Sequence, residues 1–434
     1  MRKIALLSVI VALTAHAGVD IAGTDYQIIQ PDASSGLSAV YVVRDASMAR
    51  IVYTGASGAV EWSEFSSLGG GYAREITPVN SGGEYSINAP SEGLGYIIDD
   101  GGTRTCIWVI NYEAYPYTIT GATADESDCS SVRLALQGDA PEMPYYSVNG
   151  RHLSVDRQIN VSFLNLSFND ETFSYDQIVA TKAFEYATGG LYLPASLCDT
   201  DFTIHPDRFA SVWDSAREVV SPTVKAYAVE CQTSATQTAR EADNEQKAET
   251  EALGGSAPCE ITFKAAVTDA AIFRRWEVAT TPDFLDSFLS FNDLEFTYTF
   301  EDAGSFYVRF TADNAAGACE QQSEVYTITI GESRLECPNI FTPGASEGVN
   351  DEWKVSYKSI VEFDCHIFNR WGKTLAHLTD PSQGWDGKVG GKTVGSGVYF
   401  YVITARGSDG TVYKLSGDIN VINSRRDTSP TVTE

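Results

Sequence analysis

The chain has 434 residues and carries 30 basic against 58 acidic residues, a formal net charge of −28. This charge excludes nucleic acid as a partner, because nucleic-acid binding needs a basic face, and it opposes adsorption to anionic lipid. It is typical of a well-solvated extracellular surface.

The first 17 residues have the pattern of a secretory signal peptide. The chain starts Met-Arg-Lys, residues 4–13 are apolar, and residues 15–17 read Ala-His-Ala, a small-residue cleavage site. The apolar stretch is too short to span a bilayer, which takes about 20 residues, and we predict no transmembrane segment elsewhere. Removal of residues 1–17 takes away Arg2 and Lys3 and moves the net charge from −28 to −30.

The rest of the chain reads as all-β. Runs rich in Val, Ile, Tyr, Phe and Thr alternate with clusters of Gly, Asp, Asn and Ser, as at residues 37–43, 96–98, 106–111, 159–168, 306–311, 325–330 and 398–404. We predict a tandem array of small, immunoglobulin-like β-sandwich domains with Trp62 and Trp108 in their cores. The predicted units are an N-terminal sandwich (18–138), a second β-rich domain (139–221), an immunoglobulin-like domain (222–332), a C-terminal domain (333–423) and a disordered tail (424–434).

One segment breaks this pattern. Residues 233–253 read TSATQTAREADNEQKAETEAL, with almost no large apolar side chain. A helix of this composition has no face to bury. We predict an exposed, partly helical polar insertion.

The mature chain contains an even number of cysteines, which behind a signal peptide indicates disulfides. Sequence cannot fix their connectivity, but sequential pairing is the simplest arrangement, because it puts about one bridge in each predicted domain. No Cys-x-x-Cys or Cys/His cluster is present, so neither a zinc nor a thiol-redox site is predicted. The predicted pairs are Cys106–Cys129, Cys198–Cys231, Cys259–Cys319 and Cys337–Cys365.

The third predicted domain carries immunoglobulin-type landmarks. Trp276 lies in a predicted strand at 273–278, and a Glu-Asp-Ala-Gly turn at 301–304 leads into the strand 305–310. Together with Ser-Ala-Pro at 256–258, these landmarks resemble the PKD domain. Phe306 stands in place of that family's usual Tyr, and its Gly-Asp-Gly turn after the Trp is missing. The resemblance implies a spacer or binding module of an extracellular protein.

Five short motifs follow one another in the last hundred residues. Their Gly and Asp residues suit turns, and their aromatic residues suit the core of a small antiparallel sandwich. The motifs are Pro338-Asn339-x-Phe341-Thr342-Pro343, Asn350-Asp351, Phe368-Asn369-Arg370-Trp371-Gly372, Trp385-Asp386-Gly387 and Gly397-Val398-Tyr399-x-Tyr401.

In this order the motifs resemble the gliding motility-associated C-terminal domain, which is the type B sorting domain of the type IX secretion system of Bacteroidetes. The sequence departs from that family at 344–348, where Gly-Ala-Ser-Glu-Gly replaces the frequent Asn-Gly-Asp-Gly. The resemblance implies export to the periplasm and then passage across the outer membrane guided by this domain. The implied partners are the type IX translocon and a PorP-type outer-membrane protein, and the implied location is the cell surface or the extracellular space.

No catalytic, cofactor-binding or metal-ligating residue is predicted. Outside the signal peptide the histidines are His152, His205, His366 and His377, and none lies in a hydrolase or metalloprotease motif. We therefore predict a non-enzymatic, modular surface protein, adhesin-like or structural. The alternative is a carbohydrate- or peptide-binding module of a surface complex, with a surface glycan or a host or cell-surface ligand as partner. A surface hydrolase in the first two domains is a third hypothesis.

Overall fold

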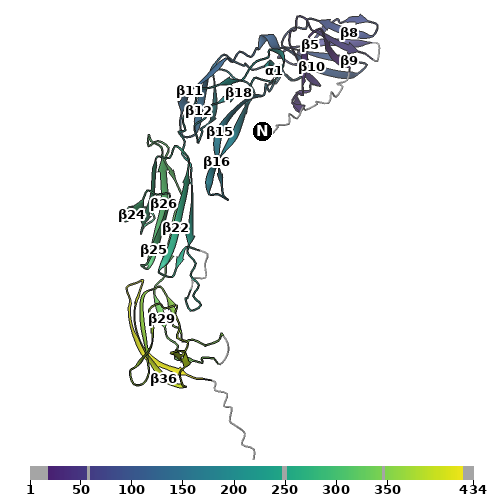
Figure 1. Ribbon diagram of the computed structural model, residues 1–434. Coiled ribbons are helices and arrows are strands. Elements are labelled where there is room, and N and C mark those ends of the chain that lie inside the picture. Colours follow the sequence, from purple (N-terminus) through teal and green to yellow (C-terminus); the bar gives the residue numbers. More distant parts are fainter. Residues whose placement is uncertain (1–17, 56–58, 247–251, 345–347, 424–434) are drawn as a thin grey trace, which may run out of the picture. The chain divides into compact units, whose positions relative to one another are not determined.

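Strands make up nearly all the regular structure of the protein (Figure 1). The structure is a computed structural model that describes residues 18–55, 59–246, 252–344 and 348–423. The predicted signal peptide and the predicted tail lie outside these residues. The all-β class is confirmed. Within the described ranges, no helix has the length and apolarity needed to cross a membrane.

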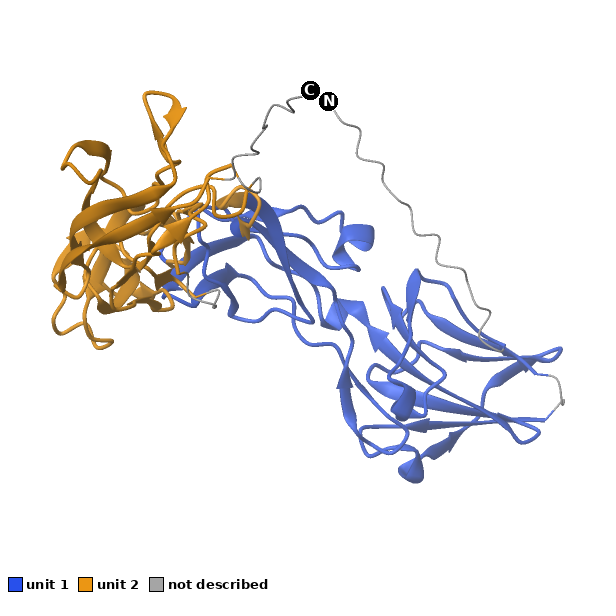
Figure 2. Ribbon diagram, turned by 90° about the horizontal axis from the view of Figure 1, so that it is seen from below, with its two compact units in different colours: residues 1–167, 177–227 blue, residues 168–176, 228–434 orange. Residues whose placement is uncertain are grey.

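The chain divides into two compact units, 1–167 with 177–227 and 168–176 with 228–434 (Figure 2). The first unit begins with a sandwich of two sheets, with strand orders β1-β4-β8-β7 and β2-β3-β10-β9-β5-β6. Its elements are β1 (Val19–Ala22), β2 (Tyr26–Ile29), η1 (Ala33–Ser35), β3 (Ala39–Val43), β4 (Arg50–Thr54), β5 (Val60–Phe65), η2 (Gly70–Tyr72), β6 (Arg74–Ile76), β7 (Val79–Ser81), β8 (Glu84–Asn88), β9 (Leu94–Asp100), β10 (Thr103–Asn111) and η3 (Tyr112–Ala114).

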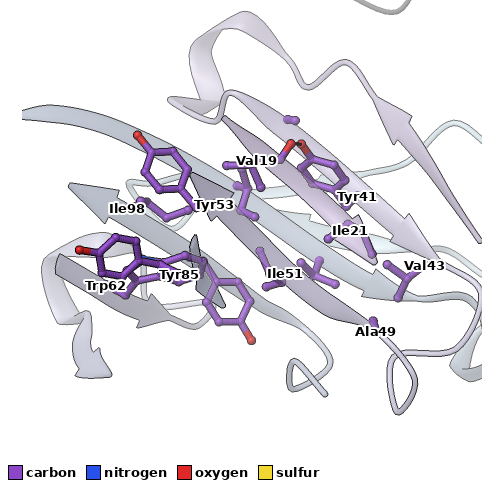
Figure 3. Packing of buried hydrophobic residues seen from close by; sticks show 14 of the residues in the cluster. Val19, Ile21, Tyr41, Val43, Ala49, Ile51, Tyr53, Trp62, Tyr85 and Ile98 are labelled. Carbon is purple, nitrogen blue, oxygen red and sulfur yellow. Dashed lines mark hydrogen bonds between the residues drawn. The ribbon is translucent and has the colours of Figure 1, made fainter. Parts of the chain in front are cut away.

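Strand β3 is buried on both faces, as its unbroken apolar run requires. Tyr41 and Val43 point into the core between the two sheets, together with Trp62 (Figure 3). Val40 and Val42 point the other way, into a second core that contains Trp108. Both tryptophans are almost fully buried, which confirms their predicted place.

The second domain of this unit has sheets of order β11-β12-β17 and β16-β15-β18-β19. The β13–β14 hairpin and α1, with the residue that precedes each of them, instead contribute Met143, Tyr145, Phe209 and Trp213 to the core that contains Trp108. The elements are β11 (Gly121–Ser127), β12 (Ser131–Gln137), β13 (Pro144–Tyr146), β14 (His152–Ser154), β15 (Ile159–Asn169), β16 (Ser174–Phe184), β17 (Gly190–Pro194), β18 (Thr203–Ile204), α1 (Ala210–Trp213) and β19 (Val219–Val220).

The predicted boundary at residue 138 is wrong. That boundary places β11 and β12 in the first domain, but β12 pairs with β17, and Val132 and Leu134 share a core with Ile159 and Val161. The glycine-containing turn after β12 connects two elements of this region rather than two domains. Turn composition alone does not distinguish these two cases.

The third domain is an immunoglobulin-like sandwich of two sheets, β20-β22-β25 and β21-β28-β26-β23-β24, with β27 beside β26. Trp276 is fully buried in the core of this sandwich, with ring centroids 4.9 Å from Phe310 and 5.7 Å from Phe263. The strands are β20 (Cys231–Gln237), β21 (Gly254–Gly255), β22 (Cys259–Val267), β23 (Phe273–Ala279), β24 (Leu289–Phe291), β25 (Glu295–Phe300), β26 (Gly304–Asp313), β27 (Gln321–Gln322) and β28 (Tyr326–Ile330).

The polar insertion predicted at 233–253 is not a helix in its described part. Strand β20 continues to Gln237 and pairs along its whole length with β22. Its Ser, Thr and Ala side chains suit an edge strand, where hydrogen bonds of the ladder hold the segment and no apolar face is needed. Residues 247–251 lie outside the described residues.

The C-terminal domain is built on a five-stranded sheet of order β30-β37-β36-β32-β33, in which β30 and β37 are parallel. Two small sheets, β29-β31 and β34-β35, complete it. Its strands are β29 (Arg334–Glu336), β30 (Ile340–Phe341), β31 (Ser356–Lys358), β32 (Ile360–Phe368), β33 (Thr374–Leu378), β34 (Lys388–Val389), β35 (Lys392–Thr393), β36 (Gly397–Gly407) and β37 (Val412–Val421).

Candidate functional site in the C-terminal domain

The first motif, at 338–343, closes the domain around Trp353. The indole Nε1 of Trp353 donates to the carbonyl of Pro338 at 2.7 Å. The carbonyl of Asn339 accepts from the backbone N–H of Asn420 at 2.8 Å, which attaches the segment to β37. Phe341 is buried in the core of the domain. These residues therefore hold the start of the domain against its last strand.

The motif at 385–387 forms the opposite wall of this core. Trp385 packs on Phe341, with ring centroids 5.4 Å apart, and on Tyr399 at 5.6 Å. Gly387 has a φ of +71°, and a Cβ there would lie 3.1 Å from the Phe341 ring, so any other residue would strain the backbone and crowd the ring. The side chain of Lys388 lowers the pKa of Asp386, whose carboxylate also accepts from the Lys388 backbone N–H at 2.9 Å.

The pair Asn350-Asp351 closes a loop. The Asp351 carboxylate accepts from the backbone N–H of Gly344 at 2.9 Å and of Gly348 at 2.7 Å. The Asn350 carbonyl accepts from the Thr342 N–H at 2.8 Å. Residues 345–347 lie outside the described residues. The carboxylate of this motif thus accepts backbone hydrogen bonds.

Strand β36 carries the last motif. Gly397 begins the strand opposite Val421, and the Tyr399 hydroxyl donates to the Gly395 carbonyl at 2.9 Å. Farther along, the Tyr401 ring lies 5.1 Å from Trp353. This motif therefore joins the strand pairing of the sheet to its aromatic core.

The motif at 368–372 forms the turn between β32 and β33. The Asn369 side chain accepts from the backbone N–H of Trp371 and of Lys373, both at 3.0 Å, and Gly372 has a φ of +80°. Phe368 lies opposite Phe400 on β36. The Trp371 side chain is 75% exposed, and the Arg370 guanidinium lies 4.3 Å above its ring. The core of the domain does not need Arg370 or Trp371, so we single out this pair as the candidate recognition turn.

A loop of the third domain contacts the C-terminal domain, which the sequence did not lead us to expect. The Asn244 side-chain amide donates to the carbonyls of Val355 at 2.7 Å and Pro381 at 2.8 Å. The Gln246 N–H donates to the Tyr357 carbonyl at 2.7 Å. Glu245 is buried and forms an ion pair with Arg240. These hydrogen bonds are made to backbone carbonyls of the neighbouring domain. They involve no apolar side chains, so no hydrophobic pattern in the sequence indicates them.

The cysteines do not pair sequentially. Cys129 and Cys319 each take part in a disulfide, whereas Cys106, Cys231, Cys259, Cys337 and Cys365 are thiols. All four predicted pairs are therefore absent, because each includes at least one thiol. Proximity along the chain does not place two Cβ atoms at bonding distance across a sheet. Burial raises the pKa of the Cys365 thiol to about 12, and nearby Cys337 adds to this effect.

Sequence reasoning also missed a hydrogen-bonded chain on the second domain. His205 Nε2 lies 2.7 Å from Ser162 Oγ, and His205 Nδ1 lies 2.9 Å from Glu218 Oε1. These contacts follow the order of a Ser–His–acid triad. Ser162 lies in β15, between β16 and β18, where the backbone N–H groups serve the sheet ladder. Acyl transfer also needs free N–H donors aimed at the oxyanion, and a central strand does not supply them.

We expect a fluorophosphonate probe to leave Ser162 unlabelled in the native protein. The reason is that a hydrogen-bonded serine without an oxyanion hole gains little reactivity. The measurement is peptide mass spectrometry after probe treatment, with an active serine hydrolase labelled in the same tube as the control. Labelling at this position that disappears in Ser162→Ala would instead support the hydrolase hypothesis.

Comparison with known families confirms the prediction for the C-terminal domain. Residues 335–419 match the model of the CHU_C type IX secretion signal domain, and residues 121–221 match a fibronectin type III domain. The second match begins at β11 and supports the corrected domain boundary. The protein is thus an exported, all-β chain, and its C-terminal signal directs it to the cell surface or the extracellular space.

No curated protein matches the chain. Similar solved structures include the tetra-tandem repeat in the extending region of a large adhesion protein, at 13% identity over 87% of this chain and 96% of that chain, with a TM-score of 0.21. A Ca²⁺-stabilized adhesin with which an Antarctic bacterium binds ice has 14% identity over 94% and 99%, with a TM-score of 0.19. The FN1–FN3 domains of chicken CNTN1 have 12% identity over 70% and 99%, with a TM-score of 0.24. Likeness at these TM-scores carries no argument about function.

Proposed function

We propose that the protein is a non-enzymatic, modular surface protein, adhesin-like or structural, which the type IX secretion system delivers through its C-terminal domain. The match of residues 335–419 to a secretion signal domain carries this proposal. The arrangement of the motifs supports it, because their residues build one aromatic core and the turns around it. The hydrogen bonds of Asn244 connect the C-terminal domain to the third domain, which precedes it in the chain.

Further details of the route belong to the same proposal. Residues 1–17 act as the signal peptide for export to the periplasm, as in a bacterium of the Bacteroidetes. The third domain is a PKD-type spacer. The outer-membrane partner is of the PorP type. Each of these statements rests on the sequence resemblance.

A binding module is the second candidate, and a depression on the third domain favours it. This hollow, of about 460 Å³, lies beside β23, and Asp313 and Glu320 contribute to its lining. Ile272 and Phe273 line it with side chains that are 59% and 58% exposed. Arg274 and Arg275 lie beside them. Exposed apolar side chains between charges of both signs suit a peptide.

A transfer experiment tests the proposed role of the C-terminal domain. We expect a periplasmic reporter fused to residues 228–434 to reach the surface of a bacterium with a type IX system, and the same reporter fused to 228–332 to stay in the periplasm. We expect Trp371→Ala in the longer fusion to lower display severalfold, because the exposed turn loses its largest contact surface. Protease treatment of intact cells measures all three. Equal display of the two unmutated fusions would contradict the proposal.

A further inference from the structure

Three side chains that can ligate metals meet on the solvent face of the C-terminal sheet. Asp364 and His366 lie two residues apart on β32 and therefore point to the same face. His377 lies on β33, directly opposite His366 in the strand pairing. Their neighbour Cys365 points the other way, into the core. The alternation of side chains along β32 places Asp364 and His366 on one face, and the pairing with β33 brings His377 beside them. A short sequence motif would not contain all three residues.

The nitrogen atoms of both imidazoles converge on one carboxylate oxygen. His377 Nε2 lies 2.5 Å and His366 Nε2 lies 3.4 Å from Asp364 Oδ1. One ligand atom from each residue lies within 4.8 Å of the others. The two imidazole rings stack with centroids 4.1 Å apart and planes 6° apart. The side chains are 54%, 39% and 48% exposed for Asp364, His366 and His377, so an ion can reach them from solvent.

We propose that Asp364, His366 and His377 form a binding site for a divalent transition-metal ion of the zinc type. Two imidazoles and one carboxylate are ligands that Zn²⁺ accepts, and three protein ligands leave a fourth position for water. At metal–ligand distances of about 2.1 Å, ligand atoms around a tetrahedral ion are about 3.4 Å apart. The 3.4 Å between His366 Nε2 and Asp364 Oδ1 already matches this spacing, whereas the 2.5 Å between His377 Nε2 and the same oxygen is shorter. Calcium and magnesium fit poorly, because both prefer shells of oxygen ligands.

Binding needs only a local change in this arrangement. The two rings must tilt out of their parallel stack so that both Nε2 atoms face one ion, and the carboxylate must move back from His377. All three side chains are partly exposed, so these rotations disturb no core packing. The negative charge of the whole chain favours cations near its surface.

The position of the site gives the ion a structural effect. His366 and His377 lie on the two strands that flank the turn at 369–372, the turn that carries exposed Trp371. A bound ion would join these strands from the solvent side, as a cross-link does. The proposed metal site does not depend on the proposed sorting role, because it rests only on the geometry of three side chains.

Zinc titration of the full exported chain tests the site. The protein is produced without a polyhistidine tag, and a chelator first removes any bound metal. We expect one zinc ion per chain in isothermal titration calorimetry. We expect Asp364→Asn, His366→Asn and His377→Asn each to weaken binding at least about tenfold, because loss of a ligand should cost no less than loss of a supporting residue. His205→Ala is the matched control, since His205 also contacts a carboxylate but has no second histidine, and its affinity for zinc should equal that of the wild type.

A second measurement on the unmutated chain removes any dependence on variant folding. With side-chain-labelled histidine, the ring signals of His366 and His377 should shift on zinc addition, while that of His152 should not. The site would be refuted if the wild type showed no saturable zinc binding, or if those two signals stayed in place. Unchanged binding by the folded His366→Asn/His377→Asn double variant would also refute it.

Discussion

Trp353→Ala is expected to lower the free energy of unfolding of the C-terminal domain by about 3–5 kcal/mol, the cost of deleting a buried tryptophan side chain. Trp353 is fully buried and packs on Tyr401, so alanine leaves a cavity. The change also removes the indole N–H that donates to the Pro338 carbonyl. Such a loss is a large fraction of the 5–15 kcal/mol that typically stabilises a folded protein.

Hydrogen exchange of the full chain measures this effect in the right domain. Backbone amides of β32, β36 and β37 should lose protection in Trp353→Ala, while those of β3 and β10 should keep it. Trp371→Ala is the control, because it changes the same residue type in the same domain at an exposed turn, and it should alter stability by no more than about 0.5 kcal/mol. Equal effects of the two substitutions would show that Trp353 is not the centre of this core.

Deletion of residues 333–434 is expected to abolish surface display. The matched secretion signal lies within this segment. The deletion leaves intact the cores around Tyr41, Trp108, Val132 and Trp276, which lie before it. The third domain gives up its hydrogen bonds to the deleted segment, such as those of Asn244, but keeps its own sandwich. The shortened protein should therefore accumulate in the periplasm in a folded form.

Much of the fold could be predicted from local patterns. In β22 and β26, alternate residues are apolar and buried, which is the period-2 signal of a strand with one face in a core. The unbroken apolar run of β3 correctly indicated a strand. The five C-terminal motifs indicated a domain because their turns and aromatic residues are close in sequence to the elements they join.

The features of the fold that could not be predicted from the sequence depend on contacts between residues far apart in the chain. The place of β12 depends on its pairing with β17, far along the chain. The loop at 244–246 is held by backbone carbonyls of another domain, and such acceptors are present at every residue, so no residue type signals them. The cysteine pairing failed for the same reason, since bonding depends on which Cβ atoms the sheets bring together.

The candidate sites were only partly predictable. The turn at 369–372 could be identified from its motif, but the exposure of Trp371 required the structure. The cluster of Asp364, His366 and His377, like the contact of Ser162 with His205, exists only through strand register. A shift of one residue between β32 and β33 would point His377 to the other face.

Protease treatment of intact cells tests whether the C-terminal domain directs the protein to the cell surface. The full chain and the chain lacking residues 333–434 are compared with an antibody against the first domain, with a periplasmic protein as the control for membrane integrity. We expect protease to degrade the full chain and to spare the shortened one. Degradation of both forms on cells whose periplasmic control stays intact would show that the C-terminal domain is not needed for surface display.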